Sequence, residues 1–241
     1  MRLQRHHDIS IPLGPVTLRG DLAIPEGAPG LVLFSHGSGS SRHSPRNRSV
    51  AERLQRSQWA TLLVDLLTER EDGAQVNRFD IDLLTGRLLG VTRWARQHLL
   101  TAGLPVGYFG ASTGAASALR AAAELGREIH AVVSRGGRPD LAAEALERVV
   151  SPTLLIVGGR DREVLALNRQ AYDRLTAVKQ IEVVPGATHL FEEPGALEEV
   201  AELAAAWFAL HMPRPEELHA GAGRVHEGKG EPYAADTLSR P

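Results

Sequence analysis

The sequence predicts an α/β fold in which a mostly parallel sheet of about eight strands is flanked by helices. Short apolar runs without in/out alternation are typical of parallel strands covered on both faces. Such runs occur at residues 31–34, 61–66, 106–109, 129–134, 153–157 and 181–184. Helical patterns separate them, near residues 48–57, 80–99, 115–125, 141–149, 164–175 and 197–210. This alternation predicts a parallel sheet with right-handed crossovers.

The first segment of the chain has a different pattern. Residues 7–12 and 16–24 alternate enough to form an antiparallel hairpin around Gly14 and Pro15. A turn-rich connection, residues 25–30, then leads into the first parallel strand. The hairpin and the six later runs together give the expected eight strands.

The length of the chain suits one domain. With 241 residues and 43% hydrophobic content, it can bury one large core. We expect residues 1–212 to form one folded domain, the one that carries the chemical motifs described below. Residues 213–241 contain several prolines and glycines and almost no apolar periodicity, so we expect a disordered tail there. Residues 135–151 leave room for one helix only, which predicts a minimal cap domain or none.

The composition limits the classes of binding partner and the cellular location that we expect. A formal charge of −2 and a pI near 6.6 argue against nucleic-acid binding. The chain has no cysteine, which excludes structural disulfides. Its first residues lack a signal-peptide pattern, and no run of about 18 apolar residues offers a membrane span. We therefore expect a cytoplasmic protein without a membrane partner, and the sequence leaves a homodimer open.

The clearest chemical motif is G-A-S-T-G at residues 110–114, between a predicted strand and an Ala-rich predicted helix. A serine in such a turn is pushed out above the edge of the sheet, where it can act as a nucleophile. Glycines two residues to either side keep bulky groups away from the sharp turn. The alternative interpretation is that Ser112 only caps the following helix.

Two further side chains follow predicted strands in the order that a nucleophile's partners require. Asp161 comes after the strand at residues 153–157 and a Gly-Gly pair, and His189 follows the strand at residues 181–184. Each could be an ordinary loop residue. Because all three side chains are expected at the same edge of one sheet, in the order Ser, Asp, His, a catalytic triad is the better interpretation.

The loop after the strand at residues 31–36 is a candidate for binding a substrate oxyanion. It reads G-S-G-S-S at residues 37–41, and small residues let backbone amides approach a substrate oxygen. We assign the donors to the amides of Ser38 and Thr113; Gly37 and Gly39 remain alternatives to Ser38. His36 is expected to brace this loop.

These motifs together resemble the α/β-hydrolase superfamily, and within it the chain is similar to the small dienelactone-hydrolase-like group. The resemblance covers roughly residues 9–212 and depends on H-G-S-G-S at 36–40, G-A-S-T-G at 110–114, G-R-D at 159–161 and G-A-T-H at 186–189. It implies hydrolysis of an ester-like bond in a small molecule, without cofactor or metal. Dienelactone hydrolases proper use a cysteine nucleophile, whereas this chain has Ser112 at that position. Esterase, thioesterase, lactonase and perhydrolase activities would share this machinery.

Arginines lie near the proposed site in the sequence. Arg42, Arg46 and Arg48 follow the glycine-rich loop, and Arg135 and Arg138 follow the run at residues 129–134. A guanidinium could hold a substrate carboxylate, or it could simply solvate a loop or pair with a nearby acid. Arg42 and Arg135 are the candidates for substrate contact.

Other functional classes fit less well. The glycine-rich loop has Arg42 where a dinucleotide-binding motif requires its third glycine. No glycine-rich loop ends in Gly-Lys-Ser/Thr, and His226 lacks a second histidine at helical spacing for zinc. A hydrolase-like scaffold that only senses a ligand remains an alternative from another class, because fold alone does not decide function.

Overall fold

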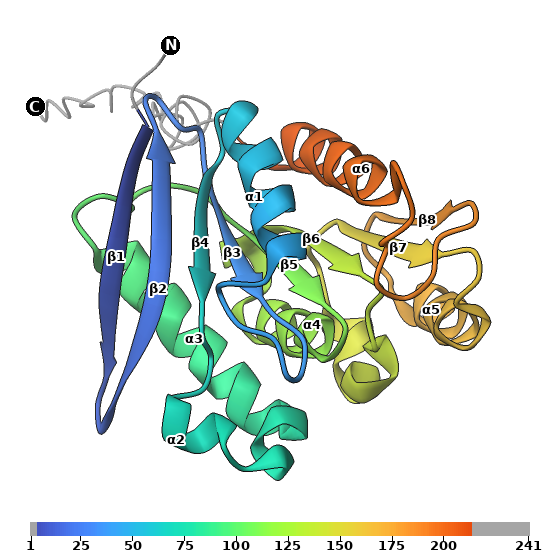
Figure 1. The fold of residues 1–241 in the computed structure, drawn as a ribbon, viewed down its shortest axis with the longest axis horizontal. Coiled ribbons are helices and arrows are strands. Elements are labelled where there is room, and N and C mark those ends of the chain that lie inside the picture. Colours follow the sequence, from blue (N-terminus) through green and yellow to red (C-terminus); the bar gives the residue numbers. More distant parts are fainter. Residues whose placement is uncertain (1–3, 214–241) are drawn as a thin grey trace, which may run out of the picture.

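The computed structural model describes residues 4–213 and shows one eight-stranded sheet between two layers of helices (Figure 1). The strand order is β1-β2-β4-β3-β5-β6-β7-β8. The strands are β1 (Gln4–Leu13), β2 (Val16–Pro25), β3 (Leu31–Ser35), β4 (Ala60–Val64), β5 (Val106–Ala111), β6 (Ile129–Arg135), β7 (Thr153–Gly158) and β8 (Lys179–Val184). Apart from residue 213, the predicted tail lies outside the described residues.

The direction of the strands confirms the predicted class. β2 pairs antiparallel with both β1 and β4, whereas every other neighbouring pair is parallel. β3, β4, β5 and β7 are buried along their whole length, as expected for apolar strands without alternation. The carboxyl ends of the parallel strands therefore meet at one edge, where α/β folds of this kind bind ligands.

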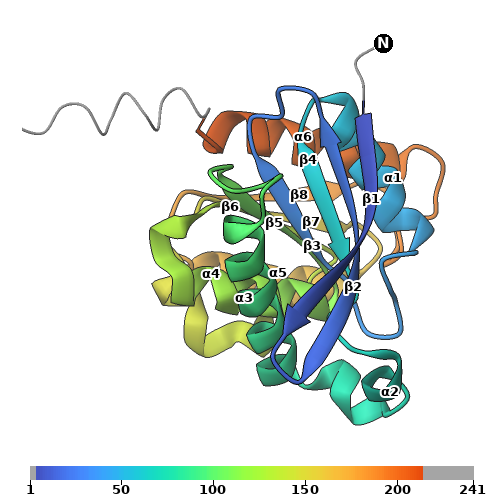
Figure 2. The same ribbon diagram turned by 90° about the vertical axis from the view of Figure 1, so that its left-hand side faces the viewer.

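Helices cover both faces of the sheet (Figures 1 and 2). α1 (Pro45–Arg56) and α6 (Ala196–His211) lie side by side on one face. α3 (Ile81–Gln97), α4 (Thr113–Leu125) and α5 (Arg162–Arg174) cover the other face. Each layer closes its own apolar core against the sheet, one containing Tyr108 and the other Phe109.

The short connections differ in detail from the sequence-based prediction. The helix expected at residues 141–149 is a 3₁₀ segment, η3 (Pro139–Arg148), interrupted by non-helical backbone at Ala142. It is the only helical element between β6 and β7 in the described chain, so the prediction of a minimal cap is confirmed. Two short elements that the sequence did not predict, α2 (Glu69–Asp72) and η1 (Gln75–Phe79), follow β4. A capping box at Thr68 and Glu71 starts α2.

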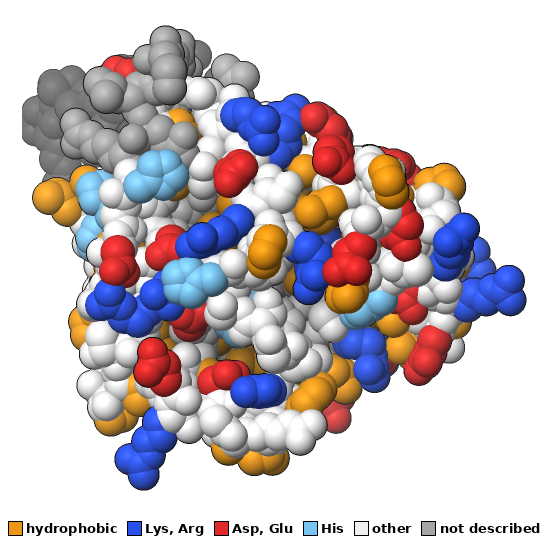
Figure 3. Space-filling model, in the orientation of Figure 1, with side chains coloured by type: hydrophobic (Ala, Val, Ile, Leu, Met, Phe, Trp, Pro, Cys, Tyr) orange, Lys and Arg blue, Asp and Glu red, His pale blue; other side chains and the backbone are white. Residues whose placement is uncertain are grey.

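The surface carries mixed charge. Acidic and basic side chains are interspersed over the face shown in Figure 3, in keeping with the small formal charge of −2. Among the described residues, no helix is long and apolar enough to cross a membrane.

The turn between β5 and α4 is packed so tightly that its glycines are required. A Cβ on Gly110 would lie 2.5 Å from the Cα of Ala115, and one on Gly114 would lie 2.2 Å from the carbonyl oxygen of Ser35. Both neighbours are backbone atoms, which cannot rotate away. The close approach of α4 to β3 therefore fixes the turn that carries Ser112.

We expect Gly114→Ala to lower the free energy of unfolding by about 1–3 kcal/mol or more, because the added methyl group overpacks against backbone. Gly86→Ala is the matched control. Gly86 is exposed in α3, a Cβ there meets nothing within 4 Å, and alanine should stabilise the helix by about 0.5–1 kcal/mol. Urea unfolding of both variants measures the difference. Equal effects of the two substitutions on the free energy of unfolding would contradict the claim that close packing requires glycine at position 114.

Candidate functional site

Ser112 sits in a strained turn at the carboxyl end of β5. Its backbone has φ 51° and ψ −122°, and it is one of three non-glycine residues with positive φ in the described chain. A side chain in such a conformation costs of order 1–3 kcal/mol and persists where surrounding structure enforces it. Here the Ser112 amide donates to the carbonyl oxygen of Arg135, and the Arg138 amide donates to the carbonyl oxygen of Ser112. The strand-to-helix turn predicted from the sequence is present.

The loops that carry Asp161 and His189 are joined to each other. The amide of Arg160 donates to the carbonyl oxygen of Ala187 at 2.9 Å, and the amide of Gly159 donates to Val184 at 2.9 Å. A Cβ on Gly158 would lie 2.5 Å from the carbonyl oxygen of Ala187, so only glycine permits this approach. The two loops therefore lie together at the edge of the sheet, although they are far apart in sequence.

The structure brings Ser112, Asp161 and His189 into one chain of polar contacts. The Nδ1 atom of His189 lies 2.6 Å from Oδ2 of Asp161, and its Nε2 atom lies 3.4 Å from Oγ of Ser112. The side chain of Asp161 is 14% exposed and that of His189 is 38% exposed. The first contact orients the imidazole, and the second is at the long end for a hydrogen bond, as is common in sites without substrate. This arrangement can deprotonate the Ser112 hydroxyl.

The loop after β3 packs directly against Ser112. A Cβ on Gly37 would lie 3.0 Å from the Cβ of Ser112, so a larger residue there would crowd the hydroxyl. The amide of Ser38 donates to Oγ1 of Thr113 at 2.8 Å. Ser38 and Thr113 are thus neighbours, as the sequence predicts, but in this structure the Ser38 amide is already engaged by the Thr113 side chain.

His36 lies behind this loop. Its Nδ1 atom is 3.0 Å from the carbonyl oxygen of Gly37, and its Nε2 atom accepts from the amide of Leu66 at 3.4 Å. The imidazole is buried and links the loop after β3 to the end of β4. These contacts agree with the predicted bracing role.

A pocket of about 220 Å³ opens above Ser112. Its lining combines the turn that carries Ser112, the glycine-rich loop, the start of α1, the end of β6 and the loop that carries His189. The lining residues are Gly37, Ser38, Ser40, Ser44, Arg46, Ala111, Ser112, Arg135, His189 and Leu190. A larger pocket of about 690 Å³ lies between α1, α6 and residues 27–29, apart from these side chains. Of the two pockets, the smaller one is lined by Ser112 and His189.

Arg42 does not line this pocket. Its guanidinium pairs with Asp65 and with Asp21, and its amide donates to Asp65 at 2.7 Å. These ion pairs tie the loop after β3 to the hairpin and to the end of β4. The structure gives Arg42 this anchoring position and does not bring it to Ser112.

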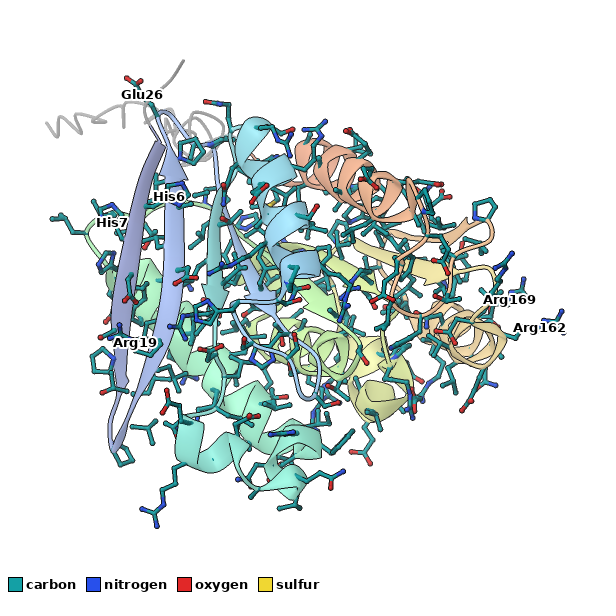
Figure 4. All side chains as sticks on the ribbon, in the orientation of Figure 1. His6, His7, Arg19, Glu26, Arg162 and Arg169 are labelled. Carbon is teal, nitrogen blue, oxygen red and sulfur yellow. The ribbon has the colours of Figure 1, made fainter. Side chains whose placement is uncertain are left out.

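Arg135, the other predicted substrate-binding arginine, is at the pocket. It ends β6 and is only 7% exposed, which is unusual for this residue type. In contrast, Arg162 and Arg169 project from α5 into solvent (Figure 4). Desolvation, followed by the charge of nearby Arg46, lowers the pKa of Arg135 to about 10, so the guanidinium remains a cation at neutral pH.

Sequence reasoning did not select three residues that the structure places around the site. Arg46 lines the pocket from the first turn of α1, and buried Asn47 accepts from Nη2 of Arg135 at 3.4 Å. Glu193 accepts from the amide of Thr188, beside His189, and this hydrogen bonding lowers the pKa of the Glu193 carboxyl. Arg46 could have been selected from the sequence, because it stands at the start of a helix shortly after the glycine-rich loop.

The described residues contain no group of three or more His, Cys, Asp or Glu side chains arranged to hold a metal ion.

No family model matches this chain. Two curated Mycobacterium tuberculosis proteins, provisionally named phosphoribosyl transferases, are 57% identical over 211 residues, which is 88% of this chain. The chain spans about half the length of these relatives, 48% of each. The esterase domain of a Rhodothermus marinus protein is 18% identical with a TM-score of 0.69, covering 86% of this chain and 99% of the other; at that identity only the fold is shown.

One solved structure shows the family to which this chain belongs. The dienelactone hydrolase from Anabaena variabilis is 54% identical to this chain and superposes with a TM-score of 0.85. The match covers 87% of this chain and 99% of that protein. The predicted fold and resemblance are confirmed: the chain belongs to the dienelactone-hydrolase-like family of α/β-hydrolases.

Proposed function

We propose that this chain is a serine hydrolase that cleaves carboxylic ester bonds of small substrates through an acyl-enzyme intermediate. The observation that supports this most strongly is the continuous contact from Asp161 through His189 to Ser112 at the mouth of a pocket. Membership of a hydrolase family supports the same class of reaction. An intact triad also favours catalysis over a ligand-sensing role for the scaffold.

In this mechanism His189 takes the proton from Ser112 while Oγ attacks the acyl carbon. Asp161 accepts from Nδ1 of His189 and stabilises the imidazolium that forms. The imidazolium then protonates the leaving alcohol, and a water molecule repeats the sequence on the acyl-enzyme. The positive φ at Ser112 holds the hydroxyl above the sheet edge throughout.

The oxyanion would be held by the amide of Thr113 and an amide of the loop after β3. The Thr113 amide lies at the start of α4, where the helix dipole also favours negative charge. Ser38 can contribute its amide once this amide turns from Oγ1 of Thr113 toward the substrate oxygen. A single preorganised donor of this kind contributes about 10²–10³ in rate.

The curated relatives are named as transferases, whereas this chain belongs to a hydrolase family. This chain matches 48% of their length, and its described residues form a hydrolase fold. We therefore propose that the transferase activity suggested by the name lies in the half that this chain does not match.

A substrate panel distinguishes the hydrolytic alternatives. Short and long p-nitrophenyl esters, acyl thioesters and lactones are compared on one enzyme preparation. The small pocket and minimal cap favour short acyl chains, so the highest kcat/KM is expected for short esters. A panel in which only thioesters or only lactones turn over would move the proposal to that activity. Turnover of none would reject hydrolysis of this class.

A further inference from the structure

Arg135 is a buried cation without a partner of opposite charge among the described residues. Its Nη2 atom donates to Oδ1 of Asn47 at 3.4 Å, and its guanidinium lies 5.8 Å from the ring centroid of Phe191. Its Nε atom is buried and has no hydrogen-bond partner in the part of the chain that the structure describes. Burying an uncompensated charge is costly, so a compensating anion is expected to come from outside the fold.

Arg46 faces the same pocket from α1. Its Nη1 atom donates to Glu192 at 3.0 Å, but its Nε atom is buried and lacks a partner among residues 4–213. The side chain of Glu192 is 63% exposed, so solvent screens most of its charge. The positive charge of Arg46 reaches Arg135, where it helps to lower the pKa. Two guanidinium groups thus border one small pocket, and the one carboxylate paired with them among the described residues, Glu192, is exposed to solvent.

The backbone adds to this positive potential. Ser44, the N-cap of the twelve-residue helix α1, lines the pocket, so the positive end of the helix dipole lies at its wall. Ser112 and His189 line the same pocket. An anionic group bound between the two arginines would therefore lie close to the reacting carbonyl group.

We propose that the hydrolase acts on esters that carry a phosphate group, and that Arg135 and Arg46 bind this phosphate while Ser112 attacks the ester carbonyl. The proposal rests on the proposed hydrolytic function. A phosphate dianion brings two negative charges to the buried Arg135 and to Arg46, whose partner Glu192 is exposed to solvent, whereas a carboxylate brings one. Its terminal oxygens can also accept from both unpartnered Nε–H groups and from the Nη groups beside them.

The size of the pocket limits the substrate. A volume of about 220 Å³ accommodates a phosphate and a short linker to the ester. The substrate class is therefore a small phosphorylated ester in which the phosphate lies a few bonds from the carbonyl carbon.

Three p-nitrophenyl esters of similar length test this assignment. They are the neutral butyrate, the succinate monoester with a free carboxylate, and the 3-phosphonopropanoate, whose phosphonate replaces phosphate. We expect kcat/KM for the phosphonate ester to exceed that for the butyrate at least tenfold, and inorganic phosphate to inhibit competitively. Arg135→Gln should lower the phosphonate-to-butyrate ratio about 10–100-fold, the range expected for losing hydrogen bonds to a charged group.

Matched variants distinguish phosphate binding by these two arginines from a general effect of positive charge on the protein. Arg46→Gln should lower the same ratio, and Arg135→Lys, which keeps the charge, should restore part of it. Arg53→Gln, on the last turn of the same helix and paired with Glu202, should leave the ratio unchanged. Thermal melting of each variant verifies folding, and Arg46→Gln tests the subsite even where Arg135 variants do not fold.

The outcomes distinguish the inference from the proposed function. Hydrolysis of all three esters with a ratio that neither Arg135→Gln nor Arg46→Gln changes would overturn the phosphate subsite and leave the hydrolase standing. An equal or higher kcat/KM for the succinate ester would also overturn it. If no ester is hydrolysed, the proposed function fails, and calorimetric titration of the same protein with inorganic phosphate decides the subsite: binding lost in Arg135→Gln supports it, and no binding overturns it.

Discussion

Ser112→Ala is expected to lower kcat for ester hydrolysis by about 10⁴–10⁶-fold, because the alanine variant has no oxygen to form the acyl-enzyme. The residual rate would come from the oxyanion-binding amides and from substrate positioning, which the substitution leaves in place. Steady-state kinetics with p-nitrophenyl butyrate measures the loss. Ser10→Ala, on the far edge strand β1, is the control and should retain full activity.

Ser112→Gly adds a stability readout to the same position. Glycine adopts φ 51° without the strain that a side chain suffers, so this variant should also be inactive but should unfold at a higher temperature than the wild type. An expected gain of about 1 kcal/mol corresponds to a rise of about 2–4 °C for a domain of this size. A Ser112→Ala protein with undiminished turnover would contradict the role of Ser112 as nucleophile. A Ser112→Gly protein that is less stable than the wild type would contradict the backbone strain at this position.

Asp161→Asn is expected to have the next largest effect, a fall in kcat of about 10⁴-fold. The carboxylate of Asp161 accepts from Nδ1 of His189 and so fixes the tautomer in which Nε2 faces Ser112. An amide nitrogen in that position would donate to Nδ1 and leave the proton on Nε2, where it blocks removal of the Ser112 proton.

The control for Asp161→Asn is Asp82→Asn. Asp82 is an exposed residue in α3 that pairs with Arg120, on the helical layer away from the triad. Its substitution should change kcat less than twofold. Burst kinetics separates acylation from hydrolysis of the acyl-enzyme, and both steps should slow in Asp161→Asn, since His189 is the base in each. If Asp161→Asn turned over at the wild-type rate, Asp161 would not be the residue that orients His189.

The positions of Ser112, Asp161 and His189 could be predicted because each depends on local sequence. The strand ends are marked by buried apolar runs, the nucleophile turn by glycines at 110 and 114, and parallel strands bring their carboxyl ends to one edge. The same reasoning predicted the opening hairpin and the order of strands and helices.

The roles of the arginines could not be predicted in this way. Whether Arg42 faces substrate depends on Asp21 in β2 and Asp65 after β4, which approach it only in the folded sheet. The burial of Arg135 depends on α1 and on the loop that carries Phe191. The contact between Ser38 and Thr113 likewise depends on the register of a loop, which composition does not set.

The central claim is that the Ser112 hydroxyl is an activated nucleophile, and covalent labelling with a fluorophosphonate tests it most directly. Intact-mass spectrometry followed by peptide mapping should show a single adduct on Ser112 in the wild type and none in Ser112→Ala. Labelling should be much slower in Asp161→Asn. An unlabelled wild-type protein, or an adduct located on another residue, would contradict the proposed hydrolase.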